Sequence, residues 1–118
     1  MSIRPAQRQY RTWTLDSRRW DGYAPRTGDI VIATAPKCGT TWTQQIVASL
    51  VFHDAKPRPL PSVSPWLDAR FRGPAAQVLA AIEAQTHRRF LKSHLPIDGL
   101  PVYDEVRYIH VARDGATP

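Results

Sequence analysis

The chain has 118 residues with 16 basic and 10 acidic side chains, which gives a net charge of +6 at pH 7. At about 100–200 residues per domain this length allows one domain, and a hydrophobic share of 42% argues against a wholly disordered chain. No apolar run reaches the roughly 18–20 residues of a membrane-spanning helix, and the basic N-terminus lacks the apolar stretch of a secretory signal. Cys38 is the only cysteine, which excludes an internal disulfide, and we expect a cytoplasmic protein without a membrane partner.

The positive charge is concentrated in the first part of the chain. Residues 1–26 contain six arginines and two aspartates, whereas residues 27–118 carry ten basic and eight acidic side chains. An arginine-rich arm fits either a basic nucleic-acid-binding module or a solvated arm at the edge of a domain. Since no more than two basic residues are adjacent, we expect an arm over 1–22 that packs on a domain over 23–118, and no nucleic-acid partner. The aromatic residues expected at the edge of the core are Trp13, Trp20 and Tyr23.

The predicted domain begins with a strand, a loop and a helix. Residues 30–34 are apolar and rich in β-branched side chains, which predicts a buried strand. Proline and glycine punctuate the loop over 35–39, and the helix follows over 40–52. Helical spacing predicts one shared apolar face for this helix. The residues on that face are Trp42, Ile46, Ser49 and Leu50.

The second half of the chain continues the same alternation. Four prolines make residues 53–66 a surface loop, and Pro74 opens a second helix over 74–85. Residues 89–93 and 106–112 predict two further strands. The order strand, helix, loop, helix, strand, strand predicts an α/β fold with a mostly parallel sheet and flanking helices. Because no helix follows the third strand, we expect the chain to be an incomplete domain, truncated after that strand.

The strongest functional pattern is the P-loop-like strand–loop–helix over residues 30–42. Unpaired N–H groups and the helix dipole favour an anion where such a helix begins, and Gly39 lets the backbone approach it closely. Lys37 adds a positive charge, and Thr40 and Thr41 add hydroxyl donors. This combination favours phosphate binding over an ordinary strand-to-helix turn. It is not a Walker A loop, because Lys37 precedes the glycine, which disfavours a kinase or an NTPase.

Residues 36–42, PKCGTTW, resemble the 5′-phosphosulfate loop of the cytosolic-type sulfotransferases, which use 3′-phosphoadenosine-5′-phosphosulfate (PAPS). Two further segments resemble the same family in the same order. Residues 89–96, RFLKSHLP, are similar to the segment that carries the catalytic histidine of these enzymes. Residues 107–115, RYIHVARDG, are similar to the strand whose terminal arginine holds the nucleotide 3′-phosphate. The resemblance covers residues 28–115.

The resemblance implies transfer of a sulfuryl group from PAPS, as co-substrate, to an acceptor hydroxyl or amine. His94 is then the general base, and a histidine at a strand end suits that role on chemical grounds as well. Lys37 stabilises the leaving group, and Lys92 holds the sulfuryl oxygens and orients the acceptor. Trp42 either stacks on the adenine or packs in the core. The implied nucleotide-binding residues are Lys37, Cys38, Gly39, Thr40, Thr41, Trp42 and Arg113.

The acceptor region lies between the phosphate loop and the histidine. In the family this region lines the acceptor pocket, and Trp66, Leu67 and Phe71 suit an apolar alcohol, phenol or amine. No cluster of histidine, cysteine and carboxylate residues has metal-ligand spacing, and we expect no metal. The family continues with a serine-bearing helix for the same phosphate, and residues 116–118 do not match it. The alternative is therefore a truncated, non-catalytic nucleotide-binding fragment.

Overall fold

The computed structural model of the chain describes residues 2–34, 40–54, 56 and 58–111. The predicted site residues Lys37, Cys38, Gly39 and Arg113 lie outside these described residues.

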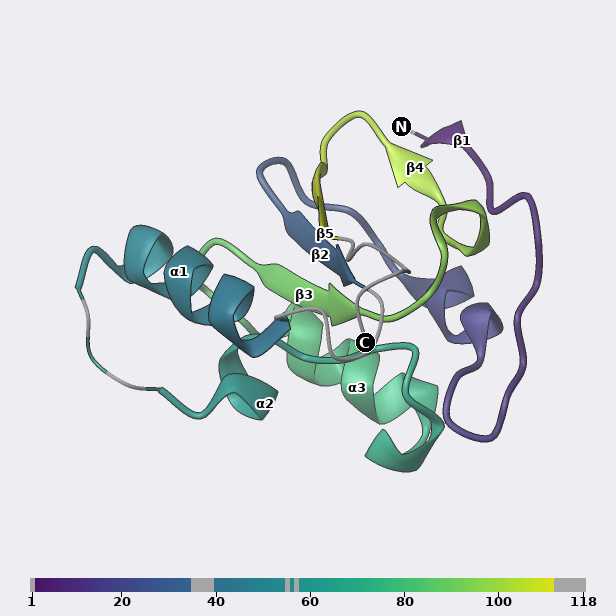
Figure 1. Cartoon of the computed structure of the whole chain (residues 1–118), viewed down its shortest axis with the longest axis horizontal. Coiled ribbons are helices and arrows are strands. Elements are labelled where there is room, and N and C mark those ends of the chain that lie inside the picture. Colours follow the sequence, from purple (N-terminus) through teal and green to yellow (C-terminus); the bar gives the residue numbers. More distant parts are fainter. Residues whose placement is uncertain (1, 35–39, 55, 57, 112–118) are drawn as a thin grey trace, which may run out of the picture.

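A three-stranded parallel sheet forms the centre of the molecule (Figure 1). β2 (Ile30–Thr34) lies between β3 (Phe90–Ser93) and β5 (Arg107–Val111), and both neighbours run parallel to it. All of β2 is buried, as expected for a short continuous apolar run with both faces covered. The predicted α/β fold with a mostly parallel sheet is confirmed, and the predicted strands over 89–93 and 106–112 start one residue too early.

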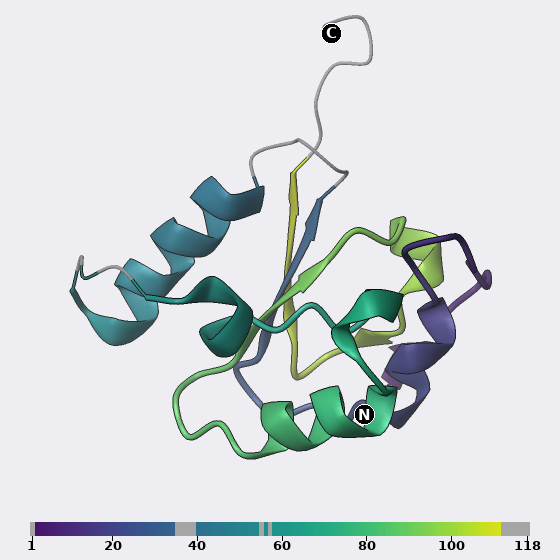
Figure 2. The same ribbon diagram turned by 90° about the horizontal axis from the view of Figure 1, so that it is seen from below.

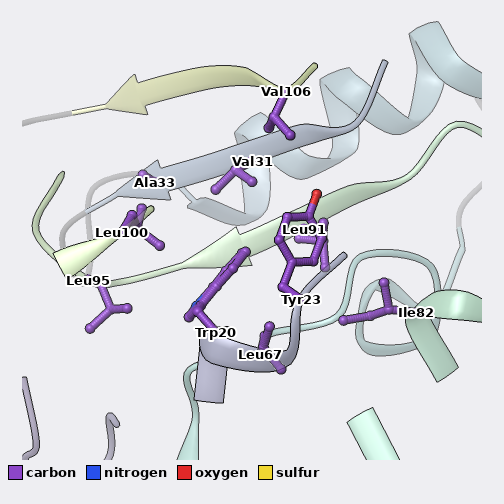
Figure 3. Packing of buried hydrophobic residues seen from close by; sticks show 10 residues of the cluster. All are labelled: Trp20, Tyr23, Val31, Ala33, Leu67, Ile82, Leu91, Leu95, Leu100 and Val106. Carbon is purple, nitrogen blue, oxygen red and sulfur yellow. The ribbon is translucent and has the colours of Figure 1, made fainter. Parts of the chain in front are cut away.

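Helices cover both faces of this sheet, so the fold has three layers (Figure 2). α1 (Thr40–Phe52) covers one face, where Val47 and Ala48 pack against Ile30 and Ile32. α3 (Ala75–Glu83) and the 3₁₀ turn η1 (Ser17–Gly22) cover the other face. The residues buried there form the main hydrophobic core around Val31 and Leu91 (Figure 3). The residues that alternate along β2 thus pack against residues at helical spacing in α1 and α3.

The predicted apolar face of α1 is wrong. Trp42, Ile46 and Leu50 are 78%, 54% and 69% exposed, respectively. The helix turns a different side to the sheet, and the residues buried on that side are Thr40, Gln44, Val47 and Ala48. Apolar residues occur on both sides of this helix, so spacing alone does not identify the packed one. Gln44 fixes the orientation further, because its side-chain amide donates to the Ser64 hydroxyl at 2.8 Å.

Several short elements were not predicted. The proline-rich segment contains the one-turn helix α2 (Leu60–Val63), and β1 (Ser2–Arg4) pairs antiparallel with β4 (Val102–Tyr103). The 3₁₀ turns η2 (Arg70–Arg72) and η3 (Ile97–Gly99) complete the described elements.

The N-terminal segment packs on the edge of the domain rather than extending away from it. Trp20 and Tyr23 are buried in the main core, as expected, whereas Trp13 is 96% exposed and that expectation is wrong. The Tyr10 hydroxyl donates to the Asp98 carboxylate at 2.7 Å, which ties this segment to the turn before β4. Figure 3 shows Trp20 and Tyr23 beneath the strands.

A buried ion pair secures the start of the sheet. Arg89 is 1% exposed and Asp29 2% exposed, and the two residues directly precede β3 and β2. The Arg89 guanidinium donates to both oxygens of Asp29, with Nε to Oδ1 at 2.9 Å. The Tyr23 hydroxyl also donates to Asp29, and burial followed by this carboxylate raises the pKa of Tyr23. The pair therefore aligns the two strands at their first residues.

We expect the change Asp29→Ala to lower the free energy of unfolding by about 3–5 kcal/mol, because it leaves the Arg89 charge buried without its partner. Urea denaturation measures this loss. Arg18→Ala is the control, since it removes a pair with Asp16 whose arginine is half exposed, and its effect should be close to zero. Equal effects of the two changes would contradict a dominant role of the buried pair.

Candidate active site

His94 lies at the carboxyl edge of the sheet, where ligands bind in open α/β folds. It directly follows β3, and the parallel register brings it beside Thr34, the last residue of β2. Its Nδ1 lies 2.7 Å from the Thr34 carbonyl oxygen. Because a carbonyl only accepts, Nδ1 must carry the proton, and Nε2 is then the nitrogen that accepts one in the neutral ring.

The first residue of α1 meets the same edge. The hydroxyls of Thr40 and Thr34 are hydrogen bonded, and the Thr34 hydroxyl is also 3.5 Å from His94 Nδ1. The side chain of Thr40 is therefore buried against the strand, whereas Thr41 is exposed and borders a cavity. The N-terminus of α1 thus lies next to the histidine.

Trp66 contacts both predicted catalytic residues at this end of the sheet, Lys92 in β3 and His94 directly after it. Lys92 Nζ is 4.1 Å from the centre of the indole ring, within range of a cation–π interaction. The ring of His94 meets the same indole edge to face, with centroids 4.8 Å apart. The backbone supports this contact, because the Lys92 N–H donates to the Pro65 carbonyl at 2.9 Å. Trp66, Lys92 and His94 therefore form one packed group.

The environment of Lys92 disfavours its positive charge. Burial lowers the pKa of the ammonium group, and the nearby guanidinium of Arg72 lowers it further, while the Asp68 carboxylate acts in the opposite direction. A bound anion would compensate for this burial and would stabilise the charged form of Lys92.

A cavity of about 610 Å³ opens beside this group. Its walls come from α1, α2, the segment after α2, η2, α3 and β3, and they combine the Trp66 indole with several amide and hydroxyl groups. The residues that line it are Thr41, Gln44, Leu60, Pro61, Ser62, Ser64, Pro65, Trp66, Arg72, Gln77, Val78, Ala81 and Lys92. Such a mixture suits a ring-bearing molecule with hydroxyl groups.

The structure separates the three residues predicted to contact the acceptor. Trp66 lines the cavity. Leu67 is fully buried in the main core, because successive residues of an extended segment point to opposite sides, and its predicted acceptor contact is wrong (Figure 3). Phe71 is 61% exposed and packs edge to face on Trp66 at 5.2 Å, so it lies behind the cavity wall and not in it.

Asp68 is a site residue that the sequence analysis missed. It is fully buried, and its carboxylate accepts hydrogen bonds from the Trp66 indole and from the backbone N–H of His94. The signal in the sequence is one acidic residue inside the otherwise apolar stretch over 65–69.

Trp42 extends from the first turn of α1 at the same end of the helix as Thr40. Its indole is largely exposed and borders a depression of about 450 Å³ on α1. The core alternative for this residue is therefore wrong. The residues around the depression are Thr41, Trp42, Gln45, Ile46 and Ser49.

The described part of the chain holds no group of three or more histidine, cysteine, aspartate or glutamate residues that could bind a metal ion. Among its helices, none combines the length and the apolar character that a membrane crossing requires.

Comparison with known proteins gives a consistent result. The sulfotransferase domain family matches residues 27–117. A glycolipid sulfotransferase of Mycobacterium tuberculosis is 50% identical over 106 residues, which cover 89% of this chain and 32% of that protein. Sulfotransferase 1B1 of Mus musculus is 32% identical over 111 residues, covering 87% of this chain and 37% of that protein.

A solved structure shares the fold. Retinol dehydratase in a complex with retinol and PAP matches with a TM-score of 0.62 and 25% identity, over 82% of this chain and 39% of that chain. The chain spans about a third of the length of the curated relatives, as the 32% and 37% coverages above show.

We expect Arg72→Gln to raise the pKa of Lys92 towards the ordinary lysine value, because it removes a positive charge that disfavours the ammonium form. Burial remains, so the return is incomplete. An NMR titration of the Lys92 side chain measures the change. Arg70→Gln is the matched control on the same 3₁₀ turn, since the Arg70 guanidinium donates to the Thr12 carbonyl instead. A Lys92 pKa that responds equally to both changes would refute this assignment.

Proposed function

Because this chain belongs to the sulfotransferase family, we propose that it transfers a sulfuryl group from PAPS to a hydroxyl or amine of a small-molecule acceptor. The observation that carries the proposal is the placement of His94. The bond from its Nδ1 to the Thr34 carbonyl leaves Nε2 to act as the base, and Lys92 contacts the same Trp66 indole as His94.

The reaction needs one proton acceptor and several fixed positive groups. His94 Nε2 takes the proton of the acceptor hydroxyl as the acceptor oxygen forms its bond to sulfur. The bond between sulfur and the bridging phosphate oxygen breaks, and its electron pair stays on that oxygen. Lys92 stabilises the charge on the sulfuryl oxygens, and the family resemblance assigns Lys37 to the bridging oxygen. Thr34 acts through His94, because its carbonyl fixes the tautomer and orientation of the ring.

The described residues fit a nucleotide donor. The N-terminus of α1 lies beside His94, and the start of a helix favours a phosphate through its backbone N–H groups and its dipole. Trp42 presents an exposed indole at the same end of the helix, and it offers a stacking surface for adenine. The resemblance adds Lys37, Cys38, Gly39 and Arg113 as further donor contacts. The PAP in the retinol dehydratase complex supports PAPS as the co-substrate.

The cavity beside Trp66 is the proposed acceptor site. The indole face supplies an apolar surface, and Gln44, Gln77 and Ser62 supply polar groups around it. The relatives include a glycolipid sulfotransferase, and the solved structure contains retinol, so a glycolipid and an apolar alcohol are both named among them. We assign an alcohol, phenol, sugar hydroxyl or amine to this cavity.

We expect His94→Gln to lower the rate of sulfuryl transfer by about 10²–10⁴-fold with unchanged affinity for PAP, the desulfated product, because only the base is removed. Transfer from ³⁵S-labelled PAPS measures the rate, and calorimetry measures PAP binding. His53→Gln is the control, since His53 is exposed after the far end of α1. An unchanged rate in His94→Gln would contradict the assignment of the base. PAP binding without any transfer in the unaltered protein would favour a nucleotide-binding fragment.

We expect Trp42→Ala to weaken PAP binding about tenfold or more, because stacking of a base on an aromatic ring contributes about 1–3 kcal/mol. The measurement is the PAP-dependent rise of the melting temperature, which follows from binding to the folded state. Leu50→Ala is the matched control, because Leu50 is exposed on the same side of α1 two turns away. A PAP-induced shift of full size in Trp42→Ala would overturn the stacking role.

A further inference from the structure

Asp68 has an unusual environment for an acidic residue. Its exposure is 0%, and it forms no ion pair among the residues that the structure describes. Three N–H groups converge on the carboxylate. Oδ2 accepts from the Trp66 indole at 2.8 Å and from the His94 backbone at 3.2 Å, and Oδ1 accepts from the Trp20 indole at 3.2 Å.

These donors explain why a carboxylate stands at this position. A buried charge is unfavourable unless hydrogen bonds or an opposite charge compensate for it. An ionised carboxylate is purely an acceptor and can serve all three donors at once, whereas an amide of the same shape would turn an N–H group towards one of them. The carboxylate is therefore matched to its donors and not to a cation.

The backbone around Asp68 is held independently of its side chain. The Asp16 N–H donates to the Asp68 carbonyl at 3.0 Å, and the Arg19 guanidinium donates to the Leu67 carbonyl at 2.5 Å. The N-terminal segment thus fixes where the carboxylate stands. A fixed carboxylate can then impose positions on the groups that donate to it.

One oxygen of this carboxylate joins the two sides of the proposed site. Trp66, which forms the cavity wall, and His94, which follows β3, both donate to Oδ2. The edge-to-face contact of their rings, at 4.8 Å, is the result of this shared anchor together with the parallel bridge between Trp66 and Lys92.

We propose that Asp68 is a positioning residue that sets the distance between the acceptor-binding wall and the catalytic base. The catalytic part of this inference rests on the proposed function. The carboxylate acts through Trp66 and His94 and does not itself touch the acceptor. Its loss should affect acceptor binding and turnover and should leave the nucleotide side of the site intact.

The test compares Asp68→Asn with Trp20→Phe. The first change replaces the carboxylate by a neutral amide, which is a weaker acceptor for Trp66 and His94 in either orientation, and the second removes only the donor to Oδ1 on the core side. In two-dimensional ¹⁵N–¹H NMR spectra we expect the Trp66 indole and His94 amide signals to move together in Asp68→Asn and to stay in place in Trp20→Phe. This measurement needs no turnover, so it tests the positioning even if the unaltered protein transfers no sulfuryl group.

The kinetic arm separates positioning from general loss of stability. We expect Asp68→Asn to lower kcat/KM for the acceptor about 10–100-fold, with higher KM and lower kcat, while KM for PAPS stays within about twofold. Trp20→Phe should lower the melting temperature but keep kcat/KM for the acceptor. Unchanged Trp66 and His94 signals in Asp68→Asn, or an equal kinetic loss in Trp20→Phe, would overturn the proposal.

A second variant keeps the test decisive if Asp68→Asn does not fold. Trp66→Phe retains an aromatic ring in the cavity wall and removes the N–H group that donates to Oδ2. The His94 amide signal should then move, because it becomes the sole remaining donor to that oxygen among those described. A His94 signal that stays in place would refute the shared anchor.

Discussion

The parallel register of β2 and β3 is the constraint on which the site depends. It places Ala33 opposite Ser93, so the next residues of the two strands, Thr34 and His94, emerge side by side. The bond between them is a direct consequence of this register. The Asp29–Arg89 pair aligns the same two strands at their other end, where the Ile30 N–H donates to the Arg89 carbonyl. The buried pair and the base therefore lie at opposite ends of the same two strands, and the five residues of β2 connect Asp29 to the residue that holds His94.

A second layer of contacts attaches the acceptor side to this sheet edge. The extended segment before η2 runs beside β3, and it directs Trp66 towards the cavity and Leu67 into the core. Asp68 then turns back towards the site. The N-terminal segment presses against this stretch through Trp20 and Arg19. Part of the arginine-rich arm thus has a structural use, since the Arg19 guanidinium donates to the Leu67 carbonyl.

The sequence predicts the sheet and its helices because their periodicities are strong and local. It does not identify which side of α1 packs on the sheet. Apolar residues occur all around that helix, and the packed side depends on contacts with Ile30, Ile32 and Phe90. It also cannot tell which residues of the stretch over 65–69 face the cavity, since that depends on a single bridge to Lys92. The pairing of β1 with β4 joins distant, very short segments and has no local signal. The motif residues His94, Lys92 and Thr41 come together as the parallel topology requires.

The two buried aspartates, Asp29 and Asp68, show that the same type of side chain can have different roles. Asp29 pairs with Arg89 and the Tyr23 hydroxyl, and its charge is compensated by a cation at the start of the sheet. Asp68 accepts hydrogen bonds from three N–H groups, which belong to Trp20, Trp66 and His94, and it forms no ion pair among the described residues. A cation at that place would bind the carboxylate more strongly and would withdraw Oδ2 from its two site donors. Dipoles leave the negative charge uncancelled, and Lys92 responds to it, since the Asp68 carboxylate raises the pKa of this lysine against the effect of burial. An uncancelled buried carboxylate thus orients the site and keeps a desolvated lysine closer to its charged form, which is the form that can hold an anionic group.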